Sequence, residues 1–155
     1  MNYILLTLSL LLTACSFKNY EHTDSKIIII KSPQLKFADL GYIRNSNDSI
    51  ELELFVAGNS VKKIAINYLV CVDEGCMSRS RFNAEYLNKA YPDTLLQNIL
   101  LGREIYHGEH KIKTEDGFIQ KISTQSVEIL YRVTLHEIFF KDKKNRIIFK
   151  IKDID

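Results

Sequence analysis

Alternation of apolar and polar side chains over two long segments constrains the fold of this chain more than any other feature. From Ile50 to Val56 every second residue is apolar, and the same holds from Val127 to Leu135. Successive side chains of a β-strand point to opposite faces, so this spacing is typical of a strand with one buried face. The pattern predicts β structure near both ends of the folded part.

Each of these segments is followed by a turn and a further apolar pattern. Gly58-Asn59 turns the chain, and residues 64–72 read as a second strand, antiparallel to the first. Its predicted apolar face consists of Ile64, Ile66, Tyr68, Val70 and Val72. Near the C-terminus, residues 142–145 reverse the chain between predicted strands at 127–135 and 147–151. Short strands are also expected at 27–30, 104–106, 111–113 and 118–122.

Helical spacing appears only in the middle of the chain. Phe82 and Tyr86 lie four residues apart after Ser78 and Ser80, either of which could cap a short helix. A second helix is expected from about Pro92 to Leu101, closed by a glycine at position 102. Its apolar stripe is Leu95, Leu96, Ile99 and Leu100. A helix of about three turns is marginal alone, so this stripe should pack on the sheet.

About seven strands with a short helical insertion predict a mainly β fold, a β-sandwich formed by residues 27–155 as one domain. A half-open barrel, or a sheet with helices on one side, is the alternative. The composition supports a sizeable core, because 46% of the residues are apolar and the chain has eight Phe and eight Tyr. With 21 basic and 19 acidic residues the formal charge is only +2, which argues against nucleic acid as a partner.

The N-terminus has a short apolar run, residues 4–12, that leads to Thr13, Ala14 and Cys15. A spanning helix needs about 20 apolar residues, so this run is too short to cross a bilayer. It fits the apolar region of a secretory signal peptide, in which small residues precede the cleavage site. We therefore expect a signal peptide at residues 1–14, and a polar tether from position 16 to about position 26.

Leu12-Thr13-Ala14-Cys15 resembles the lipobox of bacterial lipoproteins. The resemblance implies that Cys15 receives a diacylglyceryl group, that the signal peptide is cut before it, and that the new amine is, as often in this family, acylated as well, with palmitate among the expected acyl groups. Several acyl chains bind a bilayer far more firmly than one. Ser16 follows the cysteine where aspartate would imply retention in the inner membrane, so the resemblance favours the outer membrane of a bacterial cell envelope.

The order of lipobox, tether, strands, helical insertion and final hairpin also resembles immunoglobulin-like bacterial lipoproteins. That resemblance spans Cys15 to Asp155 and implies an immunoglobulin-like sandwich.

With Cys15 lipidated, Cys71 and Cys76 remain as an even pair. The Asp73-Glu74-Gly75 turn could bring their Cα atoms within the roughly 4.4–6.8 Å that a disulfide requires, and an oxidising envelope would close the bond. Two free thiols are one alternative. Zinc is another, with His107 and His110 completing four ligands, but the compartment favours oxidation. We expect no metal and no cofactor.

Catalytic motifs are missing from the sequence. It has no Gly-x-Ser-x-Gly elbow, no His-Glu-x2-His helix and no phosphate-binding glycine loop. His136 stands alone in a strand pattern, and Glu51 and Glu53 on one strand face are expected to point to water. We therefore predict that the protein is not an enzyme.

The leading functional hypothesis is a lipid-anchored envelope module whose loops or edge strand bind another envelope protein or a host-surface protein. The alternative is a carrier of lipid or a small apolar ligand, with the helix at 95–100 covering a cavity between the sheets. The charged hairpin tip at residues 141–146 is expected to be a solvated turn, or else a contact for acidic sugar or lipid head groups.

Overall fold

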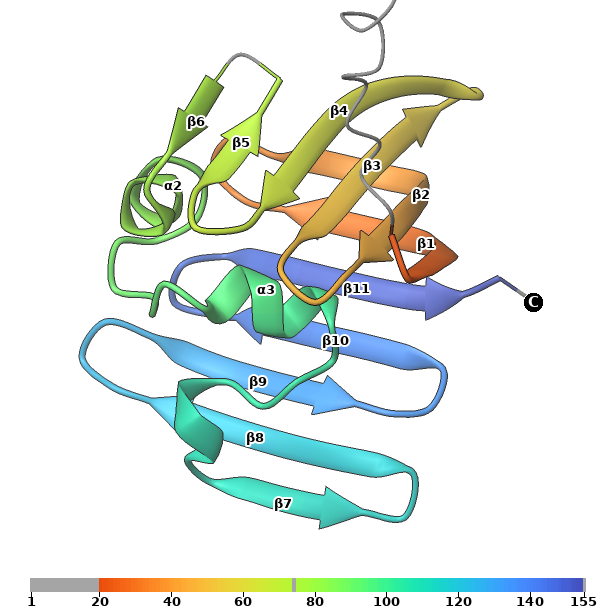
Figure 1. The fold of residues 1–155 in the computed structure, drawn as a ribbon. Helices are drawn as coiled ribbons and strands as arrows, with labels where there is room; N and C mark the ends of the chain where they lie inside the picture. The colour runs from red at the N-terminus through yellow and green to blue at the C-terminus, as the bar shows by residue number, and fades with distance from the viewer. Residues whose placement is uncertain (1–19, 74, 155) are drawn as a thin grey trace, which may run out of the picture.

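The computed structural model describes residues 20–73 and 75–154, which form an antiparallel sheet of eleven strands with a helical insertion (Figure 1). The mainly β class and the insertion are confirmed. The strand count is higher than the expected seven, and all eleven strands belong to one hydrogen-bonded order, β6-β5-β4-β3-β2-β1-β11-β10-β9-β8-β7.

The strands are β1 (His22–Lys31), β2 (Lys36–Asn45), β3 (Ile50–Val56), β4 (Asn59–Ile66), β5 (Val70–Val72), β6 (Gly75–Met77), β7 (Lys111–Thr114), β8 (Gly117–Ser123), β9 (Glu128–Val133), β10 (Glu137–Asp142) and β11 (Ile147–Asp153). The helices are α2 (Arg79–Tyr86), α3 (Leu95–Leu100) and the 3-10 turn η2 (Tyr106–Gly108).

The chain builds the sheet in two halves that meet at its centre. Strands β1 to β6 run outward to one edge, the segment with α2, α3 and η2 then crosses one side of the sheet, and β7 to β11 return from the other edge. Strand β11 pairs antiparallel with β1, with Ile28 opposite Ile151. The first and last strands are therefore neighbours in the middle of the sheet.

The core lies between the sheet and the crossing segment. Figure 1 shows α2 and α3 on one side of the sheet, and the apolar side chains that the strands point toward them are buried, from Ile28 on β1 to Phe140 on β10. The α3 residues Leu95, Leu96, Ile99 and Leu100 are 0–5% exposed. The predicted packing of this stripe on the sheet is confirmed.

Both expected helices are present and have local causes. The Ser78 Oγ accepts a hydrogen bond from the Arg81 N–H at 3.2 Å, which caps α2 as predicted. Helix α3 begins later than expected, at Leu95, and Gly102 beyond its end has a φ of +61°, a conformation that favours glycine.

Several element boundaries differ from the expectation. The strand predicted over 64–72 is two strands, because the chain turns at Asn67–Leu69 and leaves Tyr68 94% exposed. The strand predicted over 127–135 ends at Val133, and β10 intervenes between it and β11. Residues 104–106 form no strand and lead into η2. Strand β2 was not anticipated, and β1 begins at His22, within the segment expected to be tether.

Candidate functional site

Cys15, the predicted lipidation site, lies outside the described residues, so its modification stays a prediction. The described part begins at Tyr20, only five residues later. The Tyr20 hydroxyl donates a 2.7 Å hydrogen bond to the Glu51 carboxylate on β3. The chain that follows the predicted anchor is therefore fixed to the sheet from its first described residue.

Glu51 is the centre of a charged network on the side of the sheet away from α2 and α3, which we call the outer face. Its carboxylate is paired with Arg44 on β2 at 3.0 Å and with Lys63 on β4 at 3.2 Å. Arg44 also pairs with Glu53 at 2.6 Å. The expectation that Glu51 points to water is wrong, because these partners and Tyr20 leave the residue only 6% exposed.

The network shifts the pKa values of Glu51 and Tyr20. Burial raises the pKa of Glu51, but hydrogen bonds from Tyr20 and Lys63 and the charges of Lys63 and Arg44 outweigh it and hold the pKa below its usual value. Burial and the neighbouring Glu51 carboxylate raise the pKa of Tyr20 to about 12. At neutral pH Glu51 is thus ionised and Tyr20 is neutral, which suits the hydrogen bond between them.

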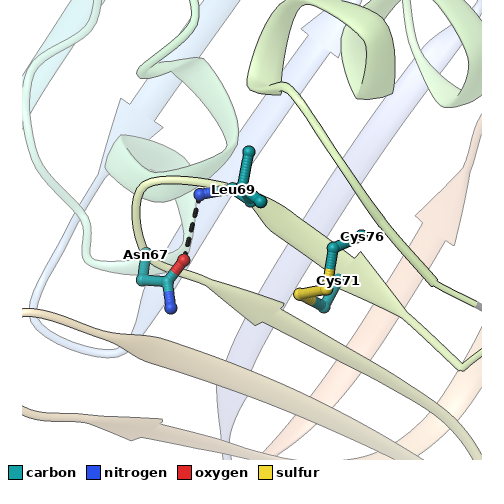
Figure 2. Close-up of a disulfide and its surroundings, with 4 residues drawn as sticks. All are labelled: Asn67, Leu69, Cys71 and Cys76. Carbon is teal, nitrogen blue, oxygen red and sulfur yellow. Dashed lines mark hydrogen bonds between the residues drawn. A yellow bond between two sulfur atoms is a disulfide. The ribbon is translucent and has the colours of Figure 1, made fainter.

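The predicted disulfide between Cys71 and Cys76 is confirmed (Figure 2). The two residues lie opposite each other on β5 and β6, with their Cα atoms 3.9 Å apart. Figure 2 also shows the turn before β5, where the Leu69 N–H donates to the Asn67 side chain at 2.9 Å. The disulfide closes the hairpin at one edge of the sheet.

The zinc alternative is not supported by this arrangement, because the disulfide occupies both thiols. Within residues 20–73 and 75–154, no group of three or more His, Cys, Asp or Glu side chains has a geometry suited to a metal ion. His107 and His110 lie in the segment that leads to β7. His136 lies in the exposed turn before β10, with its Nδ1 3.0 Å from the Asp153 carboxylate.

The edges of the sheet are poor templates for strand addition. Strand β6 has three residues and is closed to β5 by the disulfide, and β7 has four residues, two of which are lysines, Lys111 and Lys113. Short edge strands that carry lysine are a common protection against pairing with another chain. The outer face and the loops are therefore the better candidates for a binding surface.

The outer face carries exposed apolar side chains among lysines. On β1 and β2, Ile27 lies opposite Leu40, and Lys31 lies opposite Lys36. Ile27, Leu40 and the nearby Tyr42 are 38%, 48% and 37% exposed. Sequence reasoning missed this area, since residues 36–45 gave no clear strand signal. That Lys31 and Lys36 lie opposite each other follows only from the register of β1 and β2, which local sequence patterns do not give.

Further along the outer face, a shallow depression of about 420 Å³ lies over β8, β9 and β10. Leu130 lies in register with Lys121 on one side and with Lys141 on the other, and Lys143 and Glu128 also line the depression. Lys143 and Glu128 are ion-paired at 3.3 Å. The hairpin tip at 142–145 thus borders a lysine-rich surface.

Together these features define a class of small antiparallel β domain with a disulfide-closed edge and a mixed basic and apolar outer face. None of the helices that the structure describes has the length and apolar character needed to span a membrane. No family model matches the chain, and no curated protein or solved structure matches it either.

Proposed function

We propose that this protein is a lipid-anchored lipoprotein of a bacterial cell envelope, a non-enzymatic module that binds another envelope protein or a host-surface protein. The lipobox-like segment Leu12-Thr13-Ala14-Cys15 is the observation on which the proposal rests. We further propose that the acyl chains lie in the outer membrane, because Ser16 rather than aspartate follows the cysteine.

Two features of the folded part support an envelope location. The Cys71–Cys76 disulfide is of the kind that persists in oxidising compartments. The bond between Tyr20 and Glu51 fixes the chain to the folded domain within the segment expected to be tether, which supports a short connection between the domain and a lipid anchor at Cys15. The carrier alternative gains no support from α3, because its apolar stripe lies in the core.

The decisive experiment replaces Cys15 with alanine in the full chain. We expect the wild type to incorporate labelled palmitate and to remain with membranes after a high-salt wash, and the variant to lose the label and accumulate as an uncut precursor. The double variant Cys71→Ala/Cys76→Ala is the control, since it removes the two disulfide-bonded cysteines without changing the predicted anchor. Palmitate incorporation by Cys15→Ala equal to that of the wild type would refute the anchor.

The binding role needs its own test. A photo-crosslinking residue at Leu130 on the outer face should capture one defined partner in intact cells, whereas the same residue at Leu69, on the turn before β5, serves as a comparison. Both positions are exposed. If no position on the loops or the outer face yields a crosslinked protein, a protein partner is refuted.

A further inference from the structure

The outer face has an apolar centre on β1 and β2, next to the point where the described chain begins. Ile27 and Leu40 are directly opposite each other, and Tyr42 follows Leu40 on the same face of β2. The Tyr42 ring packs edge-on against Phe55 of β3, with the ring centres 5.4 Å apart. The exposed apolar side chains therefore lie on one face of neighbouring strands.

This apolar area borders lysines whose charge is poorly balanced. Lys31 and Lys36 face each other across β1 and β2, and like charges in directly opposed positions are destabilising. Within the described part of the chain, neither lysine has a carboxylate within 4.0 Å. Such a pair is stabilised when an external anion approaches both cations. We call Ile27, Leu40, Tyr42, Lys31 and Lys36 the β1–β2 face.

The predicted anchor lies within reach of this face. Tyr20 binds Glu51, which projects from β3 on the same side of the sheet as Tyr42. Tyr20 is the fifth residue after Cys15, and an extended chain spans at most about 3.5 Å per residue step, or roughly 17 Å in all. A domain anchored through Cys15 is therefore held against the lipid surface, where even weak contacts act at high effective concentration.

We propose that the β1–β2 face rests on an anionic phospholipid bilayer, the same one that holds the acyl chains of Cys15. This inference rests on the proposed lipid anchor. The exposed Ile27, Leu40 and Tyr42 are suited to the interface between head groups and acyl chains, where tyrosine is enriched. Lys31 and Lys36 lie on the same face, beyond Ile29 and Ala38 along the two strands, and lysines at a membrane surface bind lipid phosphates. A sheet surface with mixed aliphatic, aromatic and lysine side chains fits a flat anionic partner better than a single extended chain.

The test uses the processed, acylated full-length protein in vesicles of neutral phosphatidylcholine, or of phosphatidylcholine with about 30% phosphatidylglycerol. A membrane-impermeant amine reagent is added, and the modification of each lysine is measured by mass spectrometry. Lys31 and Lys36 should react at least about fivefold more slowly in the anionic vesicles, and about 0.5 M NaCl should abolish the difference. Lys89, exposed beyond α2, is the internal control and should react equally in both.

A second readout follows the apolar part of the face. Leu40→Cys, labelled with an environment-sensitive dye, should show a blue shift in anionic vesicles, and Lys31→Glu/Lys36→Glu should remove it while Lys89→Glu leaves it unchanged. Equal lysine reactivity in both kinds of vesicle would overturn the proposal, as would protection only in native membranes, which would assign the face to a protein. A chain that is not acylated would not enter the vesicles, so failure of the anchor is distinguished from failure of the face.

Discussion

The side-chain amide of Gln120 on β8 pairs with the backbone of Ile105 through two hydrogen bonds, as a neighbouring strand would. The Ile105 N–H donates to the amide oxygen at 2.8 Å, and the amide nitrogen donates to the Ile105 carbonyl at 2.9 Å. The same nitrogen also donates to the Glu109 carbonyl at 2.8 Å. Gln120 is fully buried, and its side chain ties the crossing segment to β8.

Gln120→Leu should therefore lower the free energy of unfolding by about 2–4 kcal/mol, because the buried N–H and carbonyl of Ile105 and the partly buried carbonyl of Glu109 lose their partner. Chemical denaturation measured by circular dichroism checks this value. Gln34→Leu, at an exposed position, is the matched control and should change stability by less than about 0.5 kcal/mol. A Gln120→Leu protein as stable as the wild type would show that the bonds of Gln120 do not contribute to holding the crossing segment on the sheet.

Substitution of Tyr106 should raise the stability of the protein, whereas Gln120→Leu should lower it. Among the residues described, the Tyr106 hydroxyl is the one buried side-chain polar atom without a hydrogen-bond partner. Tyr106→Phe removes this unpaired group, so we expect the free energy of unfolding to rise by about 1 kcal/mol at neutral pH. Thermal denaturation of the two proteins at one concentration measures the change. A fall of similar size would mean that the hydroxyl is satisfied.

The same substitution alters the response to alkaline pH. Burial, with the charge of Asp142, raises the pKa of Tyr106 to about 12, above its ordinary value of 10.0. The unfolded chain then releases this proton first, and the stability tied to it falls as pH rises from about 10 to about 12. Tyr106→Phe should make that decline shallower. Tyr68→Phe, which removes a hydroxyl from an almost fully exposed side chain, should leave it unchanged.

The Cys71–Cys76 disulfide encloses only four residues, so its stabilising effect should be small. Loss of the bond in Cys71→Ser/Cys76→Ser should cost about 1–2 kcal/mol, because a short loop removes little entropy from the unfolded chain. Denaturation with and without dithiothreitol measures the contribution. Reductant should lower the stability of the wild type to that of the variant and leave the variant unaffected, and a loss above about 4 kcal/mol would contradict the loop-entropy explanation.

Glu51 should control the response to acid. Its pKa is held below the ordinary value of 4.5, so the stability it provides is present above about pH 4.5 and is lost as pH falls further. Glu51→Gln should be less stable at neutral pH and should lose less stability on acidification. Denaturation between neutral and acid pH checks both effects. Glu115→Gln on an exposed turn is the control, and equal acid sensitivity of the Glu51 variant and the wild type would contradict the assignment.

The sequence was sufficient for the class of fold and for most strands, because alternation follows from the geometry of a strand. It was insufficient at Tyr68. Ile66 and Val70 pair across the Asn67–Leu69 turn and point to the same side, as they would in one straight strand. The apolar spacing is the same in both cases, so only the turn residue Asn67 could have indicated the reversal.

The charged network and the β1–β2 face were hidden for a related reason. Glu51 and Glu53 were placed correctly on one side of a strand, but Arg44 reaches them from β2, whose mixture of Gly41, Asp39 and Leu40 gives a weak strand pattern. Register between strands that are distant in sequence is not encoded in local spacing. The disulfide was predictable because both cysteines and their turn lie within six residues.

The pairing of β1 with β11 also bears on when this domain can fold during synthesis and export. Residues 26–31 pair with residues 148–153, so strand β1 can form its pairing with β11 only after residue 153 has been synthesised. Until then, the half of the sheet formed by β1 to β6 has an unpaired edge at β1 and an exposed apolar face. The seven-residue strand β11 is therefore the element that joins the two halves of the sheet.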